Sequence, residues 1–105
     1  MTRGDIHELR LRRGSGHEQH GRRLGVVVQA DEFAALSTVL VAPTSTQARA
    51  AWWRPEITVE GETTRVLVEQ TRAVDPTRIG RRLGQLTADE TWIVDDALRS
   101  VLDLA

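Results

Sequence analysis

The chain has 105 residues, of which 40% are hydrophobic, and this is enough for one modest hydrophobic core but not for two. The formal net charge of −1 excludes a protein that binds nucleic acid through bulk positive charge, so an RNA site would have to come from a local arrangement of side chains. The chain has no cysteine, which excludes disulfides and thiolate metal sites and is compatible with a reducing cytoplasm.

Apolar runs in the first half of the chain predict three strands. We place them around Ile6 to Leu11, at Leu24 to Val28 and at Thr38 to Ala42. A glycine-rich loop that ends at Gly21 follows the first strand, and a polar connection with one helical turn follows the second. Pro43 has no N–H group to offer a neighbouring strand, so we expect it to end the third strand.

The second half predicts a hairpin, a last strand and a helix. The hairpin strands are expected at 56–59 and 64–68, and the last strand at 79–86. Thr87 and Glu90 have the spacing of a helical capping box. Asp95 is expected on the solvent side of this helix. The apolar residues on the other side should pack on the sheet, and they are Ile93, Val94, Ala97, Leu98, Val101 and Leu102. Residues 1–105 are thus expected to form a single, mainly β domain, a bent antiparallel sheet or barrel closed by a C-terminal helix.

Polar groups suited to phosphate chemistry gather in the glycine-rich loop and after the third strand. Arg23 and Thr44 lie at the loop ends of two apolar runs, where a guanidinium and a hydroxyl could stabilise the charge of a phosphorane. The alternative is that Arg23 is a solvated strand edge and Thr44 a turn residue. His17 and His20 could supply acid and base groups near neutral pH or, with Glu18, a zinc site; alternatively, they are exposed loop residues without a role.

Two further features could contact RNA. Trp52 and Trp53 are adjacent, so in a strand they would point to opposite sides, and the one outside the core could stack on a base or contact a protein. Gln70 follows a strand and could hydrogen-bond a base edge through its amide, with a solvated strand end as the alternative.

In this order, the segments resemble the MazF/PemK (Kid) family of toxin endoribonucleases over nearly the whole chain. The family's motifs are an opening Arg-Gly-acid-apolar strand, a Gly-Ser-Glu-Gln-x-Gly-x-Arg-Pro loop, an apolar-Pro-x-Thr-Ser segment and an acid-Gln-x-Arg-apolar element. The corresponding segments are Arg3-Gly4-Asp5-Ile6, Gly16 to Arg23, Val41-Ala42-Pro43-Thr44-Ser45 and Glu69-Gln70-Thr71-Arg72-Ala73-Val74.

The resemblance implies a small SH3-like antiparallel barrel of the CcdB/Kid/MazF type with a C-terminal helix. It also implies cytoplasmic, cofactor-free and metal-independent cleavage of single-stranded RNA, which leaves 2′,3′-cyclic phosphate and 5′-hydroxyl ends. The catalytic residues would be Arg23 and Thr44, with Glu18 as a substitute base because a guanidinium is an unlikely base. The RNA-binding residues would be His17, Gln19, Arg22, Ser45 and Gln70.

The resemblance further implies a homodimer and a MazE-like antitoxin whose acidic segment occupies the RNA groove. Through residue 23 the chain has six arginines and three acidic residues, 6 − 3 = +3, which suits an acidic partner. Two departures from the motifs are His17 in place of serine and Leu24 in place of proline, and the second leaves Arg22 and Arg23 as alternatives for the phosphate contact. The alternative functions are a CcdB-like toxin that poisons gyrase without being an enzyme, and a catalytically inactive RNA-binding barrel.

Overall fold

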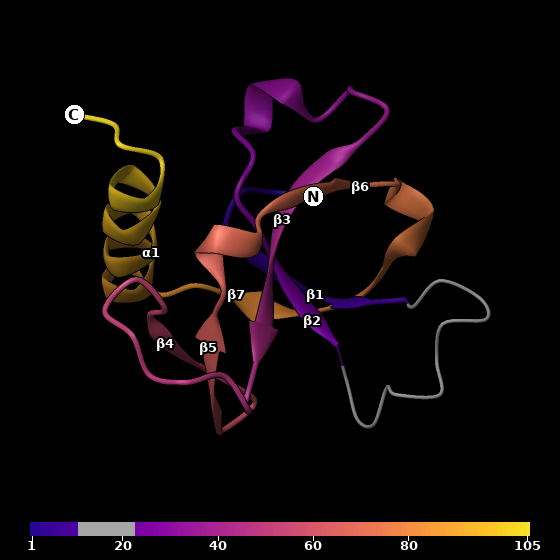
Figure 1. The fold of residues 1–105 in the computed structure, drawn as a ribbon. Coiled ribbons are helices and arrows are strands. Elements are labelled where there is room, and N and C mark those ends of the chain that lie inside the picture. Colours follow the sequence, from indigo (N-terminus) through magenta and orange to yellow (C-terminus); the bar gives the residue numbers. More distant parts are fainter. Residues whose placement is uncertain (11–22) are drawn as a thin grey trace.

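The computed structural model describes residues 1–10 and 23–105 and shows a mainly β fold with one C-terminal helix (Figure 1). The strands are β1 (Asp5–Leu9), β2 (Leu24–Val27), β3 (Val39–Ser45), β4 (Glu56–Val59), β5 (Glu62–Val66), β6 (Arg72–Val74) and β7 (Ile79–Gln85). Short 3-10 turns are η1 (Asp31–Phe33), η2 (Val68–Gln70) and η3 (Pro76–Arg78), and the helix is α1 (Ala88–Val101). The predicted site residues His17, Glu18, Gln19 and Arg22, like His20, lie outside the described residues.

The strands form a curled antiparallel sheet in the order β4-β5-β3-β2-β1-β7, and β6 pairs with β3 on the same side as β5. Figure 1 shows α1 against one side of this sheet. Because side chains alternate along a strand, β2 and β3 contribute to two buried clusters. The larger cluster includes residues of α1, and its members include Ile6, Val26, Ala42, Val66, Val94 and Ala97. The smaller cluster contains Val27, Val39, Val41, Val74 and Ile79. The prediction of a mainly β fold with a C-terminal helix is confirmed.

The hairpin of β4 and β5 is tighter than predicted. Val59 pairs with Glu62, so the turn consists of Glu60 and Gly61, whose φ angles are 52° and 81°. Positive φ at both central residues is typical of a type I′ turn, which matches the twist of the flanking strands. The second strand of the hairpin therefore begins two residues earlier than the sequence pattern indicates.

The prediction that Pro43 ends the third strand is wrong. β3 continues to Ser45, with Pro43 paired to Gly25 of β2 and its carbonyl accepting a hydrogen bond from Leu67 N–H at 2.8 Å. The backbone N of Pro43 faces the same side as this carbonyl, where η2 separates β5 from β6. Among the described residues no strand lies there to require an N–H donor, so proline costs the sheet no ladder bond. The continued strand carries Thr44 into the sheet.

The predicted capping box at the start of α1 is present, and it also ties the helix to the sheet. The Thr87 hydroxyl accepts from Glu90 N–H at 3.1 Å, and the Glu90 carboxylate accepts from Thr87 N–H at 2.9 Å. The second oxygen of that carboxylate accepts from the N–H of Thr58 on the edge strand β4, also at 2.9 Å. This bond covers an edge N–H group to which another strand could otherwise pair.

The apolar stripe of α1 packs on the sheet over less of its length than predicted. Val94 and Ala97 are buried and Leu98 packs beside them, but three members of the stripe stay exposed, namely Ile93, Val101 and Leu102. Asp95, predicted to face solvent, is partly buried and forms an ion pair with Arg3 at 2.9 Å. Among the described residues no helix, α1 included, is long and apolar enough to cross a membrane.

A buried carboxylate lies at the start of β1. Asp5 accepts hydrogen bonds from Thr2 N–H at 2.9 Å, from Arg82 Nε at 3.1 Å and from Gln85 Nε2 at 3.2 Å. Burial by itself would raise the pKa of Asp5, but the bonds from Thr2, Arg82 and Gln85 and the charge of Arg82 outweigh it, and the pKa lies below its ordinary value of 3.8. The ionised carboxylate thus links the start of the chain to β7.

We expect Asp5→Asn to lower the free energy of unfolding at pH 7 by about 1.5–3 kcal/mol, the usual contribution of a hydrogen bond to a charged group. Because the folded pKa is lowered, the stabilisation from Asp5 is present above the unfolded pKa of about 3.9 and is lost as the pH falls through the folded pKa. Urea unfolding at pH 7 and pH 3 should therefore show a smaller acid-induced loss of stability in the variant than in the wild type. Equal losses would contradict this assignment.

Candidate active site

The pairing of β2 with β3 places the two predicted catalytic residues at the same end of the sheet. In the observed register Gly25 lies opposite Pro43. Continued by two residues in the antiparallel direction, this register sets Arg23 beside Ser45, with Thr44 one residue further into the sheet. Residues that are 21 positions apart in the chain thus become neighbours across one strand pair.

Thr44 and Arg23 leave their strands on opposite faces. Thr44 pairs with the fully buried Val66 and is itself only 5% exposed, so it faces the core beneath α1. Arg23 is exposed, and strand alternation puts it on the face of Ser45 instead. A phosphate that contacts both the guanidinium and the hydroxyl would therefore have to lie beyond the strand ends.

The face of Arg23 carries a second arginine that the sequence interpretation missed. Ser45 pairs with Arg65 of β5, and Arg65 pairs with Glu56 of β4. Since the continued register of β2 and β3 sets Arg23 on the other side of Ser45, this serine lies between two arginines. The Arg65 side chain is held in place, because Nη2 donates to the Glu56 carboxylate at 2.6 Å and Nη1 donates to the Arg54 carbonyl at 2.9 Å. The alternation of side chains along β5 could have placed Arg65 on the same face as Ser45. The pairing of Arg65 with Ser45 was missed because the third strand was predicted to end at Pro43, before Ser45.

Gln70 lies apart from Arg23, Ser45 and Arg65, which lie side by side on one face of the sheet and form the Arg23 row. It is exposed at the end of η2, which connects β5 to β6 on the side of β3 away from β2. Strand β3 therefore separates Gln70 from Arg23 within one copy of the chain. A role for both residues in RNA binding requires that they contact different parts of the RNA.

Within residues 1–10 and 23–105, no group of three or more His, Cys, Asp or Glu side chains is arranged to hold a metal ion. The zinc alternative of His17, Glu18 and His20 lies outside these residues.

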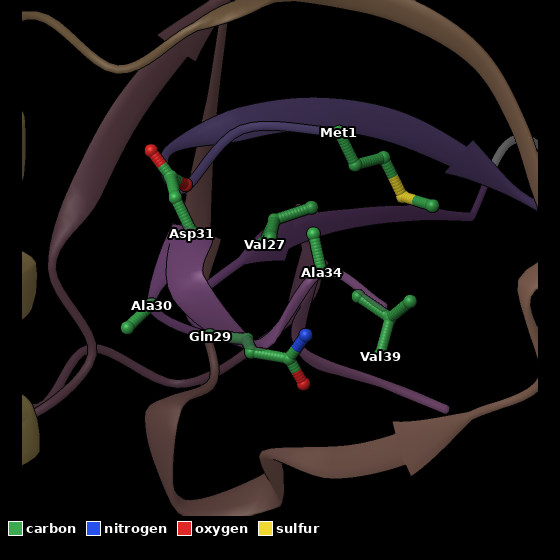
Figure 2. Close-up of a pocket in the computed structure, with 7 residues that line it drawn as sticks. All are labelled: Met1, Val27, Gln29, Ala30, Asp31, Ala34 and Val39. Carbon is green, nitrogen blue, oxygen red and sulfur yellow. The ribbon is translucent and has the colours of Figure 1, made fainter. Parts of the chain in front are cut away.

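A small cavity lies near the start of the chain. It measures about 50 Å³ and is lined by Met1, Val27, Gln29, Ala30, Asp31, Ala34 and Val39 (Figure 2). The Gln29 amide donates to the Phe33 carbonyl at 3.0 Å and accepts from Leu40 N–H at 3.3 Å, which ties the η1 segment to β3. The cavity adjoins the first residue of β3, whereas Thr44 is near the last, so it is not part of the candidate site.

A family model for PemK-like, MazF-like toxins of type II toxin-antitoxin systems matches residues 2–102. The chain belongs to this family. The match extends from before β1 to the end of α1, so it includes both Arg23 and Thr44. A curated protein of Mycobacterium tuberculosis, described as a toxin, is 40% identical to this chain over 90 residues. The matched region covers 85% of this chain and 84% of that protein.

Solved structures of MazF toxins share the fold. A mycobacterial endoribonuclease in complex with its cognate antitoxin superposes with a TM-score of 0.82 at 17% identity, covering 100% of this chain and 97% of the other. A MazE-MazF complex of Deinococcus radiodurans gives a TM-score of 0.78 at 24% identity, with 100% and 97% covered. The M. tuberculosis toxin MazF-mt6 gives 0.78 at 20% identity, with 96% and 98% covered. The curled half-barrel sheet with one C-terminal helix is therefore the MazF fold.

Proposed function

We propose that this MazF-family chain is a toxin endoribonuclease that cleaves single-stranded RNA at specific sequences, without a metal ion, in the cytoplasm. The observation that carries the proposal is the family match, which includes Arg23 and Thr44. The pairing of β2 with β3 sets these two residues at one end of the sheet. The substrate is mRNA, with tRNA and rRNA as alternatives. The products carry 2′,3′-cyclic phosphate and 5′-hydroxyl ends.

The proposed reaction is a transesterification. The 2′-oxygen attacks the adjacent phosphorus, the bond from phosphorus to the 5′-oxygen breaks, and the 5′-oxygen gains a proton in balance for the one that the 2′-hydroxyl loses. Arg23 contacts the non-bridging oxygens of the phosphorane, and the Thr44 hydroxyl donates a hydrogen bond to it. Because a guanidinium stays protonated in water, we assign the removal of the 2′-hydroxyl proton to Glu18.

Further RNA contacts in this proposal come from the loop before β2 and from the ends of β3 and η2. The residues are His17, Gln19, Arg22, Ser45 and Gln70. Ser45 is supported by its place beside Arg23 in the continued register of β2 and β3, since a hydroxyl next to a guanidinium group suits a phosphate oxygen. Gln70 is exposed beyond β3 and is assigned to a base away from the cleaved bond.

We further propose that the toxin is a homodimer. Leu40, Leu102 and Leu104 are 42%, 59% and 60% exposed and line a cavity of about 330 Å³ between α1 and the sheet. A second copy that covers these side chains would remove apolar surface from water. Sedimentation velocity should give a mass near twice 11.7 kDa, and a monomer mass at micromolar concentration would reject the dimer.

We also propose that a MazE-like antitoxin neutralises the toxin by placing an acidic segment over the RNA site. The guanidinium group of Arg23, an exposed residue at the end of the sheet, suits carboxylates as well as phosphates. Two of the structural relatives are complexes of a toxin with its antitoxin, which supports the same kind of partner for this chain.

Incubating a long single-stranded RNA with purified protein in EDTA, then mapping the new ends, tests the proposed activity. We expect cuts at a recurring sequence, with 2′,3′-cyclic phosphate and 5′-hydroxyl ends, and no cuts when the cognate antitoxin is added. RNA that is bound but left intact would favour the inactive RNA-binding barrel. RNA that is neither bound nor cut, together with inhibition of DNA gyrase, would favour the CcdB-like alternative.

A further inference from the structure

Trp52 and Trp53 lie in a tight turn and not in a strand. Arg54 N–H donates to the Ala51 carbonyl at 3.0 Å, so the two tryptophans are the central residues of a β-turn. Their ring centroids are 5.6 Å apart and the ring planes are at 85°, an edge-to-face contact. Trp53 is partly buried, while Trp52 is 72% exposed. The inner ring therefore supports the outer one, whose surface remains largely in solvent.

The residue after the two tryptophans fixes the turn to the body of the protein. Arg54 Nε and Nη2 donate to the same oxygen of Glu69 at 2.9 and 2.7 Å, and Nη1 donates to the Arg49 carbonyl at 3.3 Å. An aromatic side chain on an anchored turn has little conformational freedom to lose when a flat ligand binds to it.

The end of this turn adjoins the row of residues that contains Arg23. The Arg54 carbonyl accepts from Nη1 of Arg65, and Arg65 lies opposite Ser45. Glu56, just after the turn, is two strands away from Ser45, which corresponds to on the order of 10 Å. Figure 1 shows the loop leaving the end of β3 and turning back before it enters β4, and the bond from Arg65 to the Arg54 carbonyl places the end of this loop next to β5. The turn that carries Trp52 therefore ends close to Arg65, about two strands from Ser45.

The composition of this loop fits a nucleobase better than a protein surface. Residues 44–55 include no acidic residue, and the residues between Ser45 and Trp52 are small, polar or basic. Because the guanidinium of Arg54 is paired with Glu69, the positive charge that this loop offers to a ligand is that of Arg49. A protein interface is built around a contiguous apolar core, whereas single-strand binding combines isolated aromatic rings with positive charge.

We propose that Trp52 stacks on an unpaired base next to the scissile phosphate and strengthens the binding of single-stranded RNA. The inference deepens the proposed ribonuclease function and rests on it for the location of the scissile phosphate. Stacking itself needs no cleavage, so it can be tested separately.

The test compares Trp52→Ala and Trp52→Phe with Trp92→Ala, a matched control because Trp92 is 66% exposed on α1. Binding is measured by the fluorescence anisotropy of labelled 2′-O-methyl homopolymers of A, C and U, which lack the attacking hydroxyl. We expect Trp52→Ala to raise Kd by about 5- to 150-fold, Trp52→Phe to keep most of the affinity, and Trp92→Ala to match the wild type. The KM for RNA cleavage in EDTA should rise in parallel, with a much smaller change in kcat.

The outcomes separate this inference from the proposed function. Equal RNA binding by the wild type and Trp52→Ala would overturn the stacking role even where cleavage is confirmed, and so would a loss confined to antitoxin binding. A wild-type protein that binds none of the three homopolymers would also overturn the stacking role. Trp52-dependent binding by a wild-type protein that does not cleave RNA would support stacking and reject the nuclease. Circular dichroism of each variant shows that the fold is retained.

Discussion

Arg23→Ala is expected to lower kcat for RNA cleavage by about 10²–10³-fold, the effect typical of removing one preorganised group that stabilises transition-state charge. The fold should be unaffected, because the side chain is exposed and the backbone carbonyl keeps its 2.8 Å hydrogen bond from Leu9 N–H. Single-turnover cleavage of a long single-stranded RNA in EDTA measures the loss, and thermal unfolding checks that stability is retained.

Arg22→Ala is the matched control for this prediction. Leu24 stands where the family motif has a proline, which would restrict the adjacent backbone, so either arginine is a candidate for the phosphate contact. With Arg23 in that role, Arg22→Ala should lower kcat by less than about tenfold. Arg23→Lys should recover only part of the activity, because an ammonium cannot form the bidentate contact of a guanidinium. A large loss in Arg22→Ala alongside an active Arg23→Ala would transfer the role to Arg22.

Elements with a local signal could be predicted from the sequence. Thr87 and Glu90 are three residues apart, and their reciprocal hydrogen bonds at the start of α1 depend on that spacing alone. The strand at Leu24–Val27 follows from a short apolar run bounded by polar residues. The family motifs, likewise, are local patterns whose order in the chain was enough to identify the fold.

Features that depend on long-range pairing could not be predicted in this way. Pro43 continues β3 because η2, more than 20 residues later in the chain, leaves the side of its missing N–H without a strand. Arg65 joins the row of Arg23 only through its register with Ser45, and the tight turn at Glu60 sets where that register begins. Ile93, Val101 and Leu102 of the α1 stripe stay exposed because the helix packs on the sheet over only part of its length. The periodicity of apolar residues in a sequence does not predict how far a helix is covered.

Thr44→Val is the second variant with a large expected effect, a fall in kcat of about 10²-fold from the loss of one hydrogen-bond donor to the phosphorane. Valine has the shape of threonine, and the side chain lies beside the buried Val66 at 5% exposure, so the fold should accept the apolar substitute. Thr44→Ser keeps the hydroxyl and should retain most of the activity. The same single-turnover assay measures both variants, and a serine variant as slow as the valine variant would show that packing, and not the hydroxyl, is what matters.

The combined Arg23→Ala/Thr44→Val variant tests whether the two side chains act on one phosphate although they leave the sheet on opposite faces. Two groups that stabilise the same phosphorane depend on each other to position it, so the double variant should lose less than the product of the two single losses. Groups that act at separate places on the RNA should give the full product, because residues without a shared partner contribute additively. A multiplicative result would therefore leave Ser45, which shares the face of Arg23, as the hydroxyl to test next at the scissile phosphate.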